Sequence, residues 1–203
     1  AVAEQPVVVA DGHHRYETSL AYKGELAAAD GDAGRAGATL AYVVELVDDE
    51  LTVHAIHRLL DGLPDGTDLI ALLAPWFDDA GAPPPDEAIT AAMERAGCLT
   101  LVLPEREVLL RPRPEALEDA RDLDSSRLDV ALAGLPTHEL RFQHGVSNVR
   151  EAVRSGAAQA GVLLRPATVA QIEATAHGGD RMPPKTTFFH PKPKTGLVFR
   201  SLD

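Results

Sequence analysis

The feature that most constrains the fold is a pair of apolar, β-rich runs at residues 98–103 and 106–112, separated only by Pro104 and Glu105. Such a short connection can join antiparallel strands, whereas parallel strands need a crossover of about a dozen residues or more. The pair therefore predicts a β-hairpin and excludes a purely parallel sheet. Residues 39–47 and 51–57 form a second β-rich pair around an acidic turn, so we predict a second hairpin there.

Helical and strand patterns alternate through the rest of the chain. We predict a strand at 6–10 that leads into a helix from His14, further helices over 67–77, 86–97, 125–135, 148–157 and 168–179, and strands over 139–144, 160–167 and 196–202. The expected helix caps are Thr67 or Asp68, Gly97, Ser125 with Ser126, and Thr168. These elements predict an α+β (mixed α/β) fold, in which a mixed sheet with β-hairpins and flanking helices forms one domain over 1–203.

The charge of the chain limits its partners. The formal net charge is -12, which argues against a general nucleic-acid or membrane-surface binder and favours a small-molecule or nucleotide ligand. A local basic patch would still permit contact with DNA. No stretch approaches the roughly 20 apolar residues that cross a bilayer. The single cysteine, Cys98, excludes an internal disulfide and suits the reducing cytoplasm.

Residues 10–16, ADGHHRY, follow an apolar run and precede a helical pattern. A helix that begins just after Gly12 presents unpaired backbone N–H groups and the positive end of its dipole, which favour anions. Gly12 permits a sharp turn and the close approach of a phosphate. Arg15 can bind phosphate oxygens in a bidentate manner, and His13 and His14 can donate hydrogen bonds to them. The stretch therefore predicts a phosphate-binding turn.

Two carboxylates accompany this turn. Asp11 would repel a bare phosphate, so we interpret it as a Mg²⁺ ligand shared with the bound molecule or as the base for an attacking hydroxyl. Glu17 lies four residues after His13, where it can orient that imidazole or join the metal. The alternative is an ordinary helix cap by Asp11, with exposed histidines and Arg15 in a surface ion pair.

A second candidate region lies near the C-terminus. Residues 181–202 carry five basic residues and no acidic one: Arg181, Lys185, Lys192, Lys194 and Arg200. Prolines stiffen this segment, so Lys185 and Lys192, beside the hydroxyls of Thr186 and Thr187, could complete a phosphate site. The alternative is a basic surface loop anchored by Phe188 and Phe189. His57 and Arg58, at the end of a strand-like run, are interpreted as structural residues, with a role facing the site as the alternative.

The two regions together carry a family resemblance. ADGHHRYETSLAY (10–22) and RMPPKTTFFHPKPKTGLVF (181–199), with 40–60 and 149–176 between them, resemble the uncharacterised bacterial and archaeal family called domain of unknown function 1015. The resemblance implies that the chain is the C-terminal part of a longer family-type protein, or a natural short form of it. More distantly, the DGHHR turn is similar to that of the ParB/sulfiredoxin-like superfamily, which includes DNA-segregation CTPases and a kinase that acts on free serine. This similarity implies a nucleotide ligand.

Our leading hypothesis is a nucleotide-binding enzyme that catalyses Mg-dependent phosphoryl transfer to a small metabolite, as a kinase does, or hydrolyses a phosphate. It would use ATP or another nucleoside triphosphate with Mg²⁺. Asp11 would be metal ligand or base, residues 12–15 the phosphate cradle and Glu17 a supporting carboxylate, while Lys185 and Lys192 would stabilise charge. The alternatives are a ParB-like nucleotide-dependent regulatory or DNA-associated module and a structural domain without a ligand.

Overall fold

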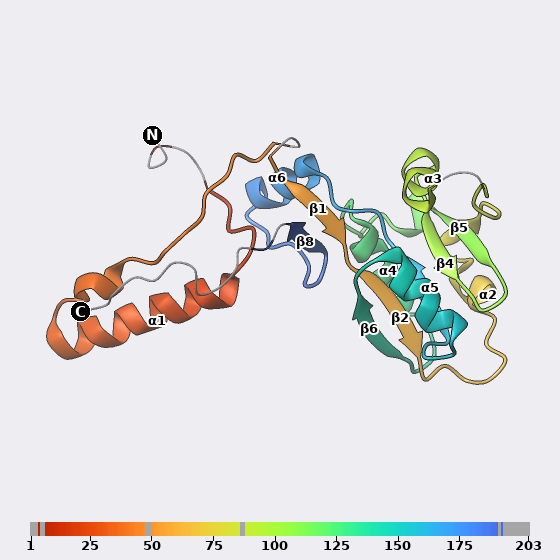
Figure 1. Cartoon of the computed structure of the whole chain (residues 1–203), viewed down its shortest axis with the longest axis horizontal. Helices are drawn as coiled ribbons and strands as arrows, with labels where there is room; N and C mark the ends of the chain where they lie inside the picture. The colour runs from red at the N-terminus through yellow and green to blue at the C-terminus, as the bar shows by residue number, and fades with distance from the viewer. Residues whose placement is uncertain (1–3, 5–6, 48–49, 86–87, 191, 193–203) are drawn as a thin grey trace. The chain divides into compact units, whose positions relative to one another are not determined.

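A computed structural model describes residues 4, 7–47, 50–85, 88–190 and 192. The chain divides into two compact units (Figure 1). Unit 1 comprises Ala1–Thr52 and Phe189–Asp203, and unit 2 comprises Val53–Phe188.

Unit 2 is built on a six-stranded sheet with the order β3-β5-β4-β7-β2-β6. Its strands are β2 (His57–Asp61), β3 (Phe77–Asp79), β4 (Leu99–Val102), β5 (Glu107–Pro112), β6 (Glu139–Gln143) and β7 (Ala160–Leu163). Every neighbouring pair in this sheet is antiparallel. The predicted hairpin of β4 and β5 is confirmed, with Leu99 opposite Leu110. The α+β fold class is confirmed as well.

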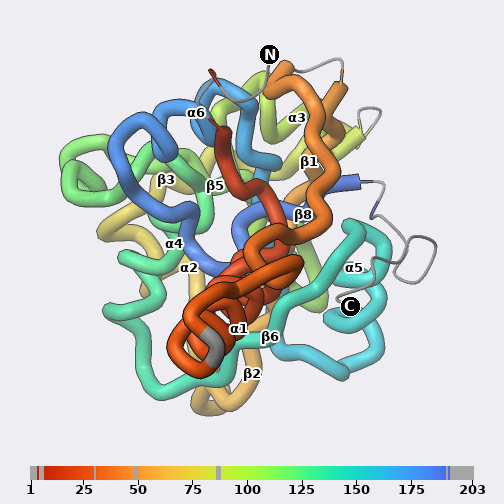
Figure 2. Tube along the Cα trace, turned by 90° about the vertical axis from the view of Figure 1, so that its left-hand side faces the viewer, coloured from red at the N-terminus to blue at the C-terminus, as the bar shows by residue number. Residues whose placement is uncertain are grey.

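Both faces of the central strands β2, β4, β5 and β7 are mainly buried, because helices cover each face. Alternate residues of a strand point to opposite faces, and Leu60 accordingly joins one apolar cluster while Leu59 joins another. The first cluster includes residues of α2 (Leu69–Leu73) and α4 (Asp124–Leu132), and the second includes residues of α3 (Ile89–Ala96) and α5 (Val146–Arg154). Figure 2 shows α2 and α4 on one side of β2 and β6, and α5 on the other.

Several helices begin or end at the capping residues that the sequence predicted. Asp68 caps α2 by accepting hydrogen bonds from the N–H groups of Ile70 and Ala71. Gly97 closes α3 with φ 65°, and Thr168 forms a capping box with Gln171 at the start of α6 (Val169–His177). The predicted cap by Ser125 and Ser126 is wrong, because α4 begins at Asp124 and both serines lie within the helix. A short 3₁₀ helix, η3, spans Pro114–Ala116.

The described residues of unit 1 include α1 (His13–Asp30), the 3₁₀ helix η2 (Gly34–Gly37) and extended chain. None of its described residues is buried. The predicted helix after the DGHHR turn is confirmed. The predicted strands at 6–10 and 39–47 are wrong for their described residues, which form no strand, and the predicted hairpin with 51–57 is therefore absent.

The β-rich run at 51–57 pairs elsewhere. It divides into β1 (Thr52–Ala55) and β2, and β1 pairs with β8 (Thr187–His190), which the sequence assigned to a proline-rich loop. β2 pairs with β6 and β7. The predicted strand at 196–202 lies outside the described residues.

Candidate functional site

The candidate site in unit 1 begins at the turn that precedes α1. Gly12 is the N-cap residue, with φ 86° and ψ 27°, a left-handed conformation that strains any residue with a Cβ. No side chain caps the helix at this position, and the first helical bond runs from the Tyr16 N–H to the Gly12 carbonyl. The N–H groups of the first turn therefore remain available to an anion, as predicted from the sequence.

Two cations and one carboxylate gather at this turn. Lys192 Nζ donates to Asp11 Oδ2 at 2.8 Å, and Arg15 Nη2 lies 3.7 Å from the same oxygen. The other oxygen, Asp11 Oδ1, accepts the Gly12 N–H at 2.9 Å. The Arg15 side chain folds back over the turn, as a distance shows: a Cβ built on Gly12 would lie 3.0 Å from Arg15 Nη2. The three side chains carry a net positive charge beside the positive end of the helix dipole.

The ion pair with Lys192 determines the protonation of Asp11. Its hydrogen bond and charge, with smaller contributions from the Gly12 N–H and Arg15, hold the pKa of the Asp11 carboxyl below its ordinary value, while partial burial opposes the shift. Asp11 is consequently ionised at neutral pH and is a weak base while Lys192 remains bound. Two neighbouring cations also make the Asp11 carboxylate a poor ligand for Mg²⁺ in this arrangement.

The other predicted residues of the turn lie on the first turns of α1. Glu17 Oε2 lies 3.7 Å from His14 Nδ1, so it can orient this imidazole, whereas the sequence predicted this support for His13. His13 is exposed. Beside the turn, Lys192 Nζ lies 6.0 Å from the centre of the Phe189 ring, a cation–π distance. These roles stay predictions.

Lys185 and Thr186 belong to unit 2. Thr186 is buried, and its hydroxyl lies 2.9 Å from Ser125 Oγ on α4. Lys185 has an exposed side chain and φ 57°, the only positive φ of a residue other than glycine in the described part of the chain. Their proposed roles toward a phosphate stay predictions.

His57 and Arg58 of β2 are buried, which agrees with the structural interpretation of these residues. His57 Nδ1 accepts the N–H of Leu164 at 3.2 Å. Burial, with smaller contributions from the charges of the neighbouring His144 and Arg58, lowers the pKa of His57 to about 4. Arg58 Nη1 donates to the Ile56 carbonyl at 2.7 Å and to the Lys185 carbonyl at 3.1 Å, and the only sequence signal for these contacts is a charge inside an apolar run.

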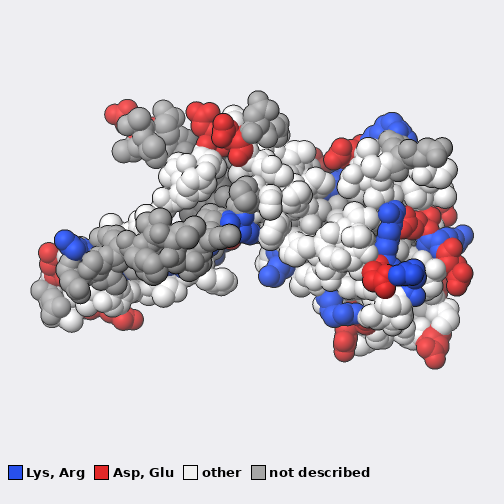
Figure 3. Space-filling view, viewed as in Figure 1, with Lys and Arg blue, Asp and Glu red and all other residues white. Residues whose placement is uncertain are grey.

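Across the residues that the structure describes, no group of three or more His, Cys, Asp or Glu side chains is arranged to hold a metal ion. On the face of unit 2 shown in Figure 3, acidic and basic side chains are interspersed. Among the described helices, none is both long and apolar enough to span a membrane.

The fold is shared with solved structures of low sequence identity. They include a free serine kinase in complex with AMP (18% identity, TM-score 0.51), a mutant free serine kinase in complex with ADP (18%, 0.50) and a conserved hypothetical protein from Pyrococcus furiosus (18%, 0.50). Each match covers 89% of this chain, which spans 66% of the kinase chains and 68% of the Pyrococcus chain. At this identity the likeness establishes the fold alone. No curated protein matches the chain.

The family follows from the sequence itself. Residues 1–131 match the family model described as a protein of unknown function, DUF1015. The chain belongs to the DUF1015 family, and the resemblance carried by the DGHHRY stretch is confirmed. The more distant similarity to ParB and sulfiredoxin stays a prediction.

Proposed function

We propose that this protein binds a nucleotide through the turn at Asp11–Arg15 and transfers a phosphoryl group to a small hydroxylated metabolite, or to water. The observation that carries the proposal is the convergence of Lys192 and Arg15 on Asp11 at the uncapped N-terminus of α1. Solved structures of the same fold include kinases in complex with AMP and ADP, which supports a nucleotide as the ligand.

The geometry suggests how a phosphate would bind. A phosphate at the start of α1 would accept backbone N–H bonds from the first turn and compete with Asp11 for Lys192 and Arg15. Once Lys192 turned to the phosphate, the pKa of Asp11 would rise toward its ordinary value, and the carboxylate would become a better acceptor for the proton of an attacking hydroxyl. Lys192 and Arg15 would then stabilise the charge on the transferred phosphoryl group.

Mg²⁺ would enter with the nucleotide. Asp11 is the residue that would hold a magnesium ion bound together with ATP, once it had released its two cations, and the ion would supply neutralisation of charge on the leaving group. We therefore expect Mg²⁺ to increase turnover of ATP and to have little effect on the affinity for AMP.

Binding tests the proposal directly. We expect isothermal titration calorimetry to detect ADP and ATP binding to the wild type and to show at least tenfold weaker binding for Arg15→Ala and Lys192→Ala, because each loses a charge-assisted hydrogen bond. The control is Lys23→Ala, which removes the same charge from an exposed position further along α1. Equal affinities in all four proteins would refute the site.

Turnover is tested separately, with γ-labelled ATP, Mg²⁺ and a panel of hydroxylated amino acids and sugars. Transfer of label to one acceptor would establish a kinase, and release of phosphate without an acceptor would establish a hydrolase. Nucleotide binding with neither reaction would support a regulatory nucleotide-binding module instead.

A further inference from the structure

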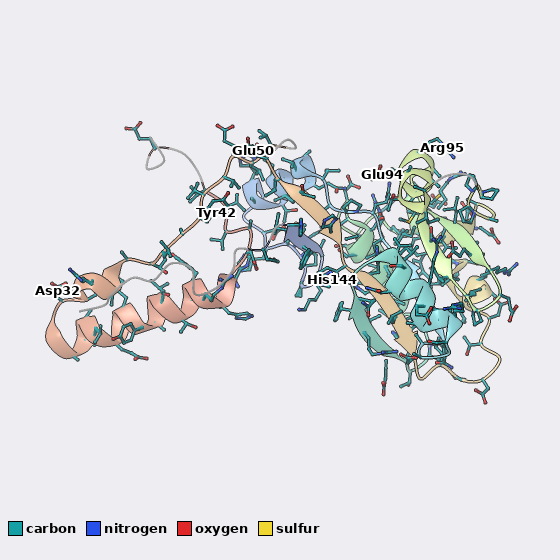
Figure 4. The ribbon with its side chains drawn as sticks, viewed as in Figure 1. Asp32, Tyr42, Glu50, Glu94, Arg95 and His144 are labelled. Atoms are coloured by element: carbon teal, nitrogen blue, oxygen red, sulfur yellow. The ribbon has the colours of Figure 1, made fainter. Side chains whose placement is uncertain are left out.

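Residues 39–47 of unit 1 present a continuous run of exposed apolar side chains. Leu40 is 62% exposed and Tyr42 is 80% exposed. Tyr42, labelled in Figure 4, lies on the extended chain between η2 and β1. The valines of the run are exposed as well: Val43, Val44 and Val47. Soluble monomers seldom leave so contiguous an apolar stretch in water, so such a stretch marks an interaction surface.

The backbone of the same run is open to a partner. Among the described residues, no backbone N–H or C=O group of residues 39–46 takes part in a hydrogen bond. Apolar, β-branched chain with free N–H and C=O groups behaves as the edge of a sheet, which pairs with another strand. The run therefore offers both its backbone and its side chains to a further strand.

The order of residues in the run favours pairing with an identical run. In an antiparallel pair centred on Val43, Leu40 lies opposite Leu46 of the second copy. Tyr42 lies opposite Val44, an aromatic–β-branched pair of the kind that stabilises antiparallel strands. Because alternate residues of a strand share a face, these four side chains form one apolar face on each copy.

Charge selects the direction of the pairing. Glu45 is the only charged residue of the run. In the antiparallel register it lies opposite Ala41, whereas a parallel pair in register would place the two Glu45 carboxylates opposite each other, which is unfavourable. The antiparallel arrangement uses the same patch on both copies and closes as a two-fold dimer.

We propose that residues 39–47 form an antiparallel strand pair, centred on Val43, with the same residues of a second copy of this chain. This homodimer interface does not depend on nucleotide binding. Two strands alone stabilise each other weakly, so we expect a dissociation constant in the micromolar range. Each chain has a formal net charge of -12, so added salt should strengthen the dimer by screening the repulsion between the copies.

The residue on the two-fold axis gives the sharpest test. We expect analytical ultracentrifugation to detect a concentration-dependent dimer of the wild type. Val43→Asp and Val43→Lys should each weaken it at least tenfold, because each places like charges opposite each other. An equimolar mixture of the two variants should dimerise again, since aspartate then faces lysine. The control is Leu20→Asp, which adds a charge at an exposed apolar position of α1 and should dimerise like the wild type.

Disulfide cross-linking tests the register. Opposite residues of an antiparallel pair have Cα atoms about 4.5–5.5 Å apart, within the span of a disulfide. Val43→Cys should therefore give a covalent dimer on mild oxidation, while the native Cys98 is buried. The control is Tyr42→Cys, at a more exposed position that lies diagonally from its equivalent at about 7–8 Å in this register. It should cross-link at least tenfold more slowly.

Three results would overturn the inference: a wild type that stays monomeric at millimolar concentration, a mixture of Val43→Asp and Val43→Lys that does not dimerise, or equal cross-linking at positions 42 and 43. Alkylation of the Val43→Cys thiol then identifies the true cover of the run in a monomer. Slow alkylation would mean that the run is covered within its own chain, and fast alkylation would leave it to a different polypeptide; both refute the homodimer.

Discussion

His57 gives unit 2 a defined sensitivity to acid. Its side chain is 4% exposed, and its Nδ1 accepts the Leu164 N–H at 3.2 Å, so the native state holds the neutral imidazole. Protonation would place a donor against a donor and a charge in a buried site near Arg58. Burial, which is the largest cause, and the charges of His144 and Arg58 lower the pKa of His57 to about 4.

The magnitude follows from linkage. The unfolded chain binds the proton with a pKa of about 6.5 and the native state only near pH 4, so the unfolded state gains protons first as the pH falls. The contribution of His57 to stability is therefore fully present above pH 6.5 and is lost as the pH falls toward 4. Between pH 7 and pH 5, the two pKa values give a loss of about 2 kcal/mol.

Urea unfolding followed by the fluorescence of Trp76 measures this loss, because Trp76 is the single tryptophan and packs against the core of unit 2. His57→Asn keeps an acceptor near the position of Nδ1 but has no titrating group there. From pH 7 to pH 5, the wild type should therefore lose about 2 kcal/mol more of its free energy of unfolding than His57→Asn loses. His177→Asn, at an exposed position, should retain the full dependence. Identical pH dependence in the wild type and His57→Asn would refute the reasoning.

Three further outcomes are expected. Lys192→Ala should raise the pKa of Asp11 toward its ordinary value, measured by carboxyl NMR, because the Lys192 hydrogen bond is the main cause of its lowering; an unchanged value would show that the pair does not form in solution. Gly161→Ala should lower the free energy of unfolding by about 1–3 kcal/mol, because the added Cβ would lie 2.4 Å from Val149 Cγ1; unaltered urea unfolding would contradict this packing. Gly24→Ala meets nothing within 4 Å inside α1 and should increase the helical circular dichroism signal, stabilising the helix by up to about 1 kcal/mol.

Elements with local causes were predictable from the sequence. Asp68, Gly97 and Thr168 end or begin helices through hydrogen bonds and dihedral angles within a few residues, and the hairpin of β4 and β5 needs only a short connection between two apolar runs. These features depend on chemistry that a short window of sequence contains.

Strands with distant partners were not predictable in the same way. Residues 39–47 have strong β propensity, yet Tyr42 is 80% exposed and the described part of this run pairs with nothing, because propensity alone does not supply a neighbouring strand. β8 lies in a proline-rich stretch with weak local signals and forms through β1, more than 100 residues earlier in the chain. Whether each of these two segments forms a strand therefore depends on pairing with a segment that lies far away in the sequence.

The candidate site likewise combines a local feature with contacts between residues that lie far apart in the sequence. The turn at Gly12 follows from its own residues, whereas the contact of Asp11 with Lys192 joins positions 181 apart and was expected only from two motifs considered together. The hydrogen bond from Arg58 to the Lys185 carbonyl had no local signal either, because it joins positions 127 apart.

Lys185 and Lys192 both take part in hydrogen bonds with charged side chains. Arg58 donates to the backbone carbonyl of Lys185, and Asp11 accepts from the ammonium group of Lys192. The six-stranded sheet of unit 2, in contrast, is stabilised by two buried apolar clusters to which neither lysine belongs. A substitution that breaks the Lys192–Asp11 pair therefore removes no contact from either apolar cluster.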